Sequence, residues 1–337
     1  MKVAIDKNTI GKVKGNYDFI YVFDNETLDE LQKLNMKCMS KDYIESVDVN
    51  LTDYNIDCLK KANVNDTDWN EIKFKENKIA IIIPNCNYAD CLEKCFNSLL
   101  NQTYKNFQII FIDDMSTDNS VEIAQKMLKP PHKVIQLKQK RLNGGARNEA
   151  YLHLDDDVDY IWYVDSDDWV KDENVLETIN NKLQSNPDVA FVGMARYKAQ
   201  KESTIFIPNY KDKYEAIQGW SGSCGKVIKK SLATRQECLY NEGTLKEDRN
   251  QHCKICIYMN TFVNIQKPCY VWNQENRKSV TTVRDKVIWG TSTIRHYADT
   301  LQLYLSEQGK DPRIDRYLKQ RVDQTRQEVM TGGDKQW

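Results

Sequence analysis

Three aspartates directly follow an apolar stretch of the sequence, and their carboxylates suit a hard divalent cation. Asp165, Asp167 and Asp168 come after the apolar run 160–164. Mg²⁺ and Mn²⁺ bind carboxylate oxygens, use few protein ligands and take the rest from phosphates and water. Such a cation would neutralise a diphosphate leaving group and make its departure easier. The alternative is a solvated acidic turn that caps the next helix.

A second acidic pair, Asp113 and Asp114, follows the apolar run 109–112. Carboxylates at the end of a strand can accept hydrogen bonds from ribose hydroxyls or from the N–H group of a base. They can equally cap a helix that begins near Ser116, because Asp-x-x-Ser turns are frequent. The pair by itself leaves both interpretations open.

The segment 143–148, Asn-Gly-Gly-Ala-Arg-Asn, combines a flexible glycine turn with a fixed cation. The guanidinium of Arg147 is planar and always charged, which suits a phosphate or a base carbonyl. An ion pair with a neighbouring acidic residue is the alternative. The turn does not match GxGxxG and no GxxxxGK occurs, so neither dinucleotide nor P-loop chemistry is supported.

Apolar strands that alternate with helical patterns must position these residues. The run 79–83 is continuous and ends at Pro84, which is typical of a central parallel strand. Asp90, with Glu93 three residues later, is expected to begin the next helix as a capping box. Further strands and helices follow in alternation, and this order predicts a doubly wound α/β sheet. The further strands are expected at 109–112, 134–137 and 160–164.

Ligands of doubly wound sheets bind beyond the carboxyl ends of the strands. Polar clusters lie at three of these ends, and Pro84, Asn85 and Asn87 form the first of them. The two aspartate clusters form the others. The occurrence of polar clusters at three strand ends is stronger evidence for a ligand site than any one cluster is by itself.

The sequence on either side of this sheet carries no recognisable chemistry of its own. A strand at 19–23 and a helix over Leu28, Leu31 and Leu34 predict a small N-terminal α/β appendage. Beyond residue 186 the order becomes mixed, and strands are expected at 189–193, 261–265 and 270–272. Two apolar stripes near the end predict helices that pack on the main domain or on another subunit. The stripes are Ile294, Tyr297, Leu301 and Tyr304, then Ile314, Leu318 and Val322.

Composition places the chain among ordinary globular proteins. Its 337 residues include 48 basic and 49 acidic side chains, so charge gives no reason to expect nucleic acid or an anionic membrane. No apolar run approaches the roughly 20 residues that span a bilayer, and the start lacks a signal-peptide core. We expect a cytoplasmic protein whose ten spread cysteines are reduced. Cys253 and Cys256 form a lone CxxC, for which helix packing is favoured over metal or redox use.

Taken together, these motifs resemble the inverting glycosyltransferases of family 2, which have the GT-A fold. The resemblance runs from Ile79 to about Asp172, through IIIPNCNYADCLEKCFNSLLNQTYKNFQIIFIDDMSTDNS, NGGARNEA and YVDSDDWV. Cys86 replaces the usual aromatic residue, whose place beneath the base Tyr88 is a candidate to take. Met115 replaces the usual glycine, which suggests a less unusual backbone angle there.

The resemblance implies a fold and a division of the chain. The fold is a GT-A type doubly wound mixed sheet flanked by helices, with the small N-terminal α/β appendage and a helical C-terminal region. The implied regions are an appendage of unknown role at 1–75, a glycosyltransferase domain at 76–283 and the helical region at 284–337. Within the domain, 76–172 is the nucleotide-binding half and 173–283 the acceptor half.

The resemblance also assigns the donor site. Asp113 or Asp114 would hold the nucleoside and Arg147 would approach the base. Asp165 would contact the ribose or the metal, and Asp167 would be the principal ligand of Mn²⁺ or Mg²⁺. Asp168 would support these residues or cap a helix. The nucleotide-sugar, with a UDP-sugar as the commonest family case, would also contact Pro84, Asn85, Asn87 and Ser166.

A weaker similarity extends to about Val280 and implies the catalytic group. The family carries an acidic pair below the acceptor cleft, which here would be Glu247 and Asp248, with Asp248 as the general base. An ordinary acidic helix start is the alternative. Arg277 and Lys278 would lie in a segment that closes over the diphosphate, or in a basic surface loop. Because the Gln-x-x-Arg-Trp signature is absent, a single-addition enzyme is favoured over a polymerase.

Two other functions remain open from the sequence. A sugar-phosphate nucleotidyltransferase could share the sheet and the metal-binding aspartate, but it would normally need a glycine-rich segment at its first strand. A non-catalytic carbohydrate-binding protein could keep the same fold without turnover. The acceptor is equally open among a glycan, a lipid-linked sugar, a protein side chain and a modified base. A homo-oligomer formed through the C-terminal helices is a further expectation.

Overall fold

The structure of this protein is a computed structural model. It describes residues 2–5, 19–22, 75–244, 246–275, 286–306 and 311–331. The chain divides into two compact units, one of residues 1–76 with 178–186 and the other of 77–177 with 187–337. In the first unit, β1 Lys2–Ile5 pairs in parallel with β2 Phe19–Val22, which confirms the strand expected at 19–23. The helix expected over Leu28, Leu31 and Leu34 lies outside the described residues.

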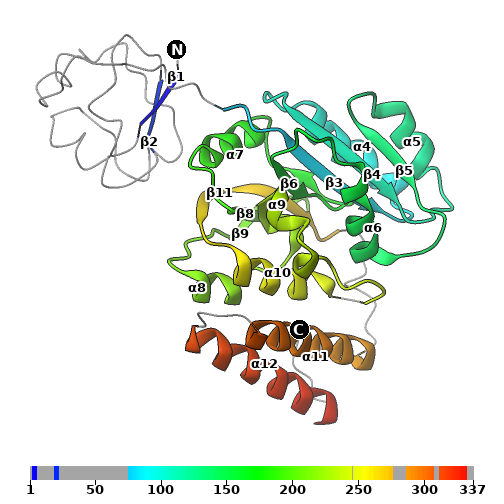
Figure 1. Ribbon diagram of the computed structural model, residues 1–337. Coiled ribbons are helices and arrows are strands. Elements are labelled where there is room, and N and C mark those ends of the chain that lie inside the picture. Colours follow the sequence, from blue (N-terminus) through cyan, green and yellow to red (C-terminus); the bar gives the residue numbers. More distant parts are fainter. Residues whose placement is uncertain are drawn as a thin grey trace, which may run out of the picture. The chain divides into compact units, whose positions relative to one another are not determined.

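The second unit is built on a nine-stranded sheet, and the predicted fold class is confirmed (Figure 1). The strands are in the order β5-β4-β3-β6-β10-β8-β11-β7, and β9 pairs with β8. The strands are β3 Ile79–Asn85, β4 Phe107–Asp113, β5 Lys133–Gln136, β6 Tyr160–Tyr163, β7 Trp169–Val170, β8 Val189–Lys198, β9 Lys201–Phe206, β10 Lys226–Lys229 and β11 Phe262–Asn273. The helices are α4 Ala89–Leu100, α5 Ser120–Met127, α6 Leu142–Ala150, α7 Val175–Leu183, α8 Lys213–Gln218, α9 Lys230–Ala233, α10 Glu247–Tyr258, α11 Lys286–Ser306 and α12 Pro312–Thr331.

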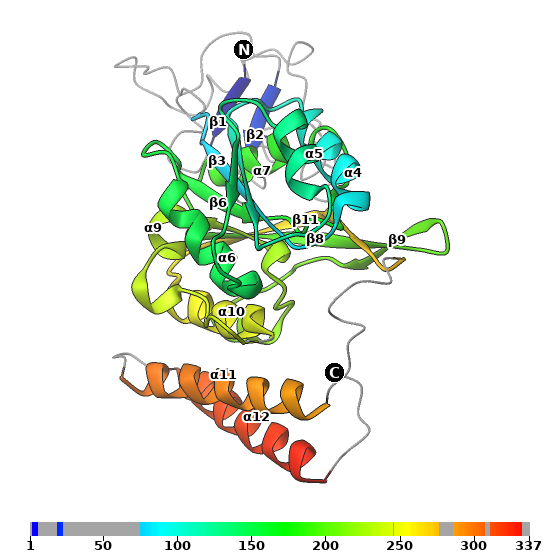
Figure 2. The same ribbon diagram turned by 90° about the vertical axis from the view of Figure 1, so that its right-hand side faces the viewer.

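The continuous apolar runs arise because helices cover both faces of the parallel strands. Figure 2 shows α4 and α5 on one side of the sheet and α6 and α9 on the other. Alternate side chains of a strand point to opposite faces. Ala80 and Ile82 of β3 therefore share a core with Ala146 of α6, while Phe111 of β4 packs edge-on against Phe96 of α4 at 5.6 Å between ring centroids.

The second half of the sheet is mixed, as expected. β10 runs antiparallel to both β6 and β8, and β11 runs parallel to β8. The two strands expected at 261–265 and 270–272 are one strand, β11, whose register shifts between Ile265 and Tyr270. Pro268 lies inside that irregular stretch, where a strand tolerates a residue without a backbone N–H.

Both helix starts expected from capping residues are wrong. Tyr88 is the N-cap of α4, and the backbone N–H of Ala89 donates to the Asp118 carboxylate at 3.0 Å from the neighbouring loop. Asn119 is the N-cap of α5. Ser116 instead contacts Asp113. Tertiary contacts thus supply the donors and acceptors that the local capping patterns were expected to supply.

The two C-terminal stripes form α11 and α12, as predicted. Tyr297, Tyr304, Ile314 and Leu318 are buried in the core that also contains residues of α6 and α10. Asn250 of α10 donates to the His296 carbonyl at 3.1 Å, which joins α10 to α11. Among the described residues, no helix is both long and apolar enough to cross a bilayer.

Candidate functional site

The carboxyl ends of β3 and β4 lie side by side and share hydrogen bonds. Asn85 is paired in register with Asp113, and its Nδ2 donates to Asp113 Oδ1 at 3.0 Å. Ser116 donates to the same carboxylate from its backbone N–H at 2.9 Å. Asn85 Oδ1 is buried and has no hydrogen-bond partner among the described residues. This strand end thus holds one buried acceptor whose hydrogen bond is not supplied by the described part of the chain.

Asp114 fixes the turn that leads to α6. Its carboxylate accepts the backbone N–H groups of Arg141 at 2.8 Å and Leu142 at 2.9 Å. The adjacent Met115 has a φ of 62°, in the left-handed region. The ordinary backbone angle expected from methionine at this position is therefore wrong. The bonds from Ser116 to Asp113 hold the turn in a shape that glycine would adopt more easily.

Asn87 and Cys86 complete the first strand end beyond the buried Pro84. Asn87, also at a φ of 62°, accepts the Thr117 N–H at 2.7 Å through its side-chain oxygen. Lys140 Nζ lies 2.6 Å from the Cys86 sulfur and donates to the Asp114 carbonyl at 2.9 Å. Burial, and then the charges of Asp167 and Asp165, raise the pKa of Tyr88. The ring of Tyr88 therefore lies near the aspartates that follow β6.

The aspartates after β6 alternate between accessible and buried positions. Asp165 and Asp167 are partly exposed, whereas Ser166 and Asp168 are buried. Asp168 accepts the Tyr270 hydroxyl at 2.5 Å and the Asn273 N–H at 2.7 Å, both from β11. Burial, followed by the charges of Asp167 and Asp165, raises the pKa of Asp168 well above its usual range. Asp168 thus ties β11 to this strand end.

Asp165 and Asp167 are the carboxylates that fit a hard cation. Their side chains are partly exposed and are separated by one residue, Ser166. Carboxylate oxygens are the ligands that Mn²⁺ and Mg²⁺ prefer. No group of three or more acidic, histidine or cysteine residues in the described part of the chain could hold a metal ion. A cation here would accordingly take its remaining ligands from a diphosphate and water.

The glycines of the 143–148 segment lie inside helix α6, so the flexible turn expected there is wrong. A side chain on Gly144 would approach Glu247 Cγ to 3.0 Å and Tyr240 Cβ to 3.2 Å. The glycine therefore allows α6 to pack closely against the segment 240–247. Asn148 of the same helix exchanges two hydrogen bonds with the Tyr240 backbone, each of 3.0 Å.

Arg147 is a buried cation that joins three carboxylates. It is 1% exposed. Its Nη2 donates to Asp165 Oδ1 at 2.8 Å, and its Nη1 donates to Glu247 Oε1 and Asp248 Oδ1 at 3.0 Å each. Burial alone would lower the pKa of Arg147, but the surrounding acidic groups, led by Asp248 and Asp165, raise it well above its usual range. Through Arg147, the structure thus brings Asp165, which follows β6, together with the acidic pair of α10.

The acidic pair begins helix α10, and its two members differ in exposure. Glu247 is buried, and burial, followed by the charge of Asp248, raises its pKa to about 7. The Asp248 side chain is 34% exposed, so a proton acceptor is open to solvent there. Arg277 and Lys278 lie outside the described residues.

Two hydroxyl residues near Asp248 were not identified from the sequence. Ser223 donates to Asp248 Oδ1, and the Tyr240 hydroxyl lies 2.6 Å from the Ser223 oxygen. Serine and tyrosine are common types and neither belongs to a motif, so no pattern in the sequence marks them. Cys253 and Cys256 are buried in the core on α10 as free thiols.

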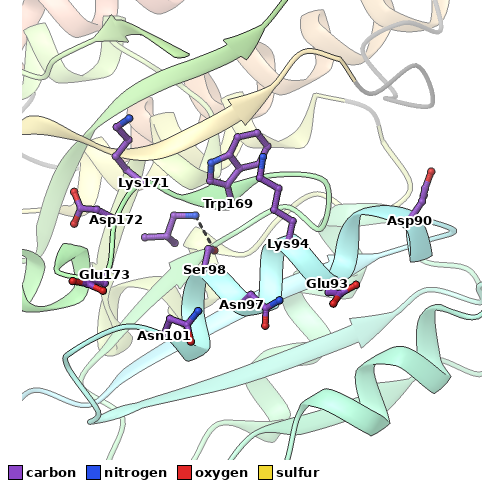
Figure 3. Close-up of a pocket in the computed structure, with 11 residues that line it drawn as sticks. Asp90, Glu93, Lys94, Asn97, Ser98, Asn101, Trp169, Lys171, Asp172 and Glu173 are labelled. Carbon is purple, nitrogen blue, oxygen red and sulfur yellow. Dashed lines mark hydrogen bonds between the residues drawn. The ribbon is translucent and has the colours of Figure 1, made fainter. Parts of the chain in front are cut away.

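A separate pocket of about 660 Å³ lies between α4 and the segment 169–173 (Figure 3). Lys94 of α4 lies over the Trp169 ring, with Nζ 3.1 Å from its centroid. The Val170 N–H donates to the Ser98 hydroxyl at 3.0 Å at the base of the pocket. Its described lining residues include none of those assigned to the donor, the metal or the base.

Comparison with known proteins relates this chain to a protein family. Residues 80–246 match the family model described as glycosyl transferase family 2. The glycosyltransferase GlyA of Streptococcus pneumoniae is 26% identical over 221 residues, which cover 58% of this chain and 30% of that protein. A poly(ribitol-phosphate) beta-glucosyltransferase of Bacillus spizizenii is 34% identical over 117 residues, covering 33% of this chain and 18% of that protein. The chain therefore spans well under half of the length of these relatives.

Solved structures agree on the fold. S. aureus TarS in complex with UDP-GlcNAc superposes with a TM-score of 0.59 at 18% identity and covers 75% of this chain and 73% of that one. The mannosyltransferase PcManGT from Pyrobaculum calidifontis, in complex with GDP-Man and Mn²⁺, has a TM-score of 0.50 at 13% identity, covering 76% of each chain. The family match places residues 80–246 among the family 2 glycosyltransferases, and the solved structures show that the surrounding mixed sheet has the GT-A fold.

Proposed function

We propose that this chain transfers a sugar from a nucleotide-diphosphate sugar to the hydroxyl of an acceptor, with inversion, in a single addition that needs Mn²⁺ or Mg²⁺. The observation that carries the proposal is the Arg147 cluster, in which one buried cation holds Asp165 and Asp248 together. A transferase needs its leaving-group site and its base within one substrate's length. Because Arg147 bonds to both groups, they satisfy that need.

The donor would lie across the ends of β3, β4 and β6. Asn85, whose side-chain oxygen is buried and has no partner among the described residues, would meet a base N–H or a ribose hydroxyl only if the bound donor reaches beneath the surface of this strand end. Pro84, Asn87 and Ser166 would line the same surface. UDP-sugars are the preferred candidates, since TarS is described in complex with UDP-GlcNAc and with UDP. Arg277 and Lys278 remain candidates for contact with the diphosphate.

Asp113, Asp114 and Arg147 would affect donor binding indirectly, through the residues of the chain to which they bond. Their charged groups already bond within the chain, so they would hold the shape of the nucleotide surface more than they touch the nucleotide. Asp167, supported by Asp165, would hold the cation. When bound, that cation would stabilise the negative charge that develops on the leaving diphosphate.

Asp248 would act as the general base. Its carboxylate would take the proton from the acceptor hydroxyl while that oxygen attacks the anomeric carbon. The bond from the anomeric carbon to the diphosphate breaks as the new bond forms, and its electron pair leaves with the diphosphate. Attack from the face opposite the leaving group inverts the configuration. Glu247 would remain beside the base as a partner of Arg147.

A donor screen read by mass spectrometry tests this proposal. The protein would be incubated with UDP-glucose, UDP-galactose, UDP-GlcNAc and GDP-mannose in the presence of Mn²⁺, with and without sugar acceptors. We expect at least one donor to be hydrolysed or transferred. If every donor stays intact, or if a nucleoside triphosphate and a sugar phosphate are joined instead, the transferase proposal is wrong.

The variant Asp248→Asn tests the base. Because the amide cannot accept the proton, turnover should fall by about 100-fold or more, while UDP affinity measured by calorimetry stays within about twofold. The matched control is Asp157→Asn, an acidic side chain that is 71% exposed and pairs with Lys78 on the surface. Wild-type turnover in Asp248→Asn would mean that another group is the base.

A further inference from the structure

A chain of two hydroxyl groups ends on the carboxylate of Asp248. Ser223 Oγ bonds to Asp248 Oδ1 and lies 2.6 Å from the Tyr240 hydroxyl oxygen. An ionised carboxylate can only accept, so Ser223 donates its single proton to Asp248. Tyr240 must then donate its own proton to Ser223. The chain therefore runs in one direction, from the phenol through the serine to the carboxylate.

The bonds to Asp248 distinguish its two oxygens. Oδ1 accepts from Ser223 and also from Arg147 Nη1 at 3.0 Å. Within the described part of the chain, Oδ2 accepts no hydrogen bond. Two donors from different elements thus fix the plane of the carboxylate. They leave Oδ2 with its lone pairs open on a side chain that is 34% exposed.

Tyr240 is held firmly enough to orient this chain. Its ring is 3% exposed, and its backbone N–H and carbonyl both bond to the Asn148 side chain of α6 at 3.0 Å. The guanidinium of Arg147 lies 5.3 Å from the centre of its ring. Burial raises the pKa of the Tyr240 phenol well above its usual range, so the hydroxyl keeps the proton that it donates.

The backbone that precedes Ser223 is held by a buried lysine. Ser223 begins a short 3₁₀ turn, Ser223–Gly225, that precedes β10. Lys226 is fully buried, and its ammonium donates to the carbonyls of Ser221 at 3.2 Å and Gly222 at 2.7 Å. The Cys224 carbonyl accepts the Trp162 indole N–H at 2.8 Å. The two bonds from the Lys226 ammonium thus restrain the backbone on which Ser223 lies.

We propose that Ser223, backed by Tyr240, is a positioning residue that aims Oδ2 of Asp248 at the acceptor hydroxyl. The inference rests on the proposed function, because Ser223 acts only through the base. Loss of either hydroxyl leaves the donor surface unchanged and lets the carboxylate rotate away from the acceptor. Turnover then falls while donor binding does not.

Kinetics of hydroxyl-deletion variants test this inference. Ser223→Ala should lower kcat on the order of 10- to 100-fold, and Tyr240→Phe by about threefold to tenfold, with the donor KM within about twofold of wild type. Ser223→Thr keeps the hydroxyl and should restore most of the turnover. Tyr151→Phe is the matched control, since it removes a partly buried hydroxyl that pairs with Tyr163 at 2.5 Å.

The same substitutions in the Asp248→Asn background separate positioning from general support of the fold. Once the base is gone, Ser223→Ala should cause no further loss, because groups that act as a unit are not additive. Losses that multiply in the double variant, or wild-type kcat in both Ser223→Ala and Tyr240→Phe, would overturn the inference and leave the base assignment intact. Failure of the proposed base is seen separately, as full turnover in Asp248→Asn alone.

Discussion

Carboxylates at the strand ends differ in what they bond to, and this difference assigns their roles. Asp113, Asp114 and Asp168 are buried and accept hydrogen bonds from their own chain. Asp165 and Asp167 are partly exposed. A metal ligand must be accessible and ionised, so Asp167 is the better candidate than its buried neighbour Asp168.

The variant Asp167→Asn should abolish metal-dependent donor binding. The amide removes one negative charge from the cation's ligands, so Mn²⁺ should no longer strengthen the binding of UDP. Calorimetry with UDP, with and without Mn²⁺, measures this, and Asp157→Asn on the surface should behave as wild type. An unchanged UDP affinity with Mn²⁺ would refute the role of Asp167.

Replacement of Met115 by glycine should stabilise the protein. Met115 is 49% exposed and has a φ of 62°, a conformation that costs a residue with a side chain about 1 kcal/mol. Met115→Gly should therefore raise the free energy of unfolding by about 1 kcal/mol, while Met115→Ala should not. Urea titration measures both. Equal stability of the two variants would contradict the backbone explanation.

Helix α6 combines close packing at its glycines with polar contacts made by the residues that follow them. Its first turns carry two glycines, and the residues that follow place Arg147 and Asn148 against the acidic pair and Tyr240. One short segment, 144–148, thus provides both the close approach of α6 to the residues 240–247 and the hydrogen bonds to them. Helix α6 contacts β3 and β4 as well as α10.

Gly144→Ala should destabilise the protein although it lies in a helix. Alanine is normally better than glycine there by about 1 kcal/mol. Here its Cβ would lie 3.0 Å from Glu247 Cγ and 3.2 Å from the Asn241 carbonyl oxygen. We expect a loss of about 1–3 kcal/mol in unfolding free energy and reduced turnover.

The control for this variant is Asn143→Ala, which lies exposed on the same helix. It should leave stability unchanged or slightly raised, because only helix propensity changes. Urea titration and the donor assay are measured on both proteins. A Gly144→Ala variant more stable than wild type would show that α6 does not need this close approach.

At the scale of the whole second unit, the Arg147 cluster makes stability depend on pH. Arg147, Asp165, Glu247 and Asp248 come from three separate elements and meet in the interior. Arg147 and Glu247 are buried, so removal of a partner would leave a buried group without its hydrogen bonds, which is costly. The cluster therefore joins α6, the segment after β6 and the start of α10.

Glu247 should contribute stability that is lost as pH rises. Its pKa is raised from 4.5 to about 7 in the folded protein, so the folded state binds this proton more tightly than the unfolded state. The contribution is complete below about pH 4.5 and disappears as pH rises through about 7. Urea titration across this window should show a flatter pH dependence in Glu247→Gln than in wild type. Parallel curves for the two proteins would contradict the raised pKa.

Much of the fold could be predicted from the sequence because its signals are local. The apolar runs that became β3, β4 and β6 are continuous, and their polar ends mark the edge where ligands bind. The stripes of α11 and α12 follow helical spacing. Helix starts were harder to predict, since Asp118 from another loop receives the first N–H of α4. In an isolated peptide a helix can be capped only by residues next to it in the sequence. Here a residue of another loop accepts the free N–H at the start of the helix instead.

The residues proposed for the donor site were chosen from their motifs and from the family resemblance, but their contacts depend on partners distant in the sequence. Arg147 bonds to Asp165 18 residues away and to Glu247 100 residues away. Ser223 and Tyr240 reach Asp248 only because β10 and the segment before α10 fold beside it. The sequence alone indicated the family, the sheet and the aspartates at the strand ends, because these follow from local pattern and motif. The tertiary structure decided which charges pair and which oxygen of Asp248 is left open, because those bonds form only once the elements have packed.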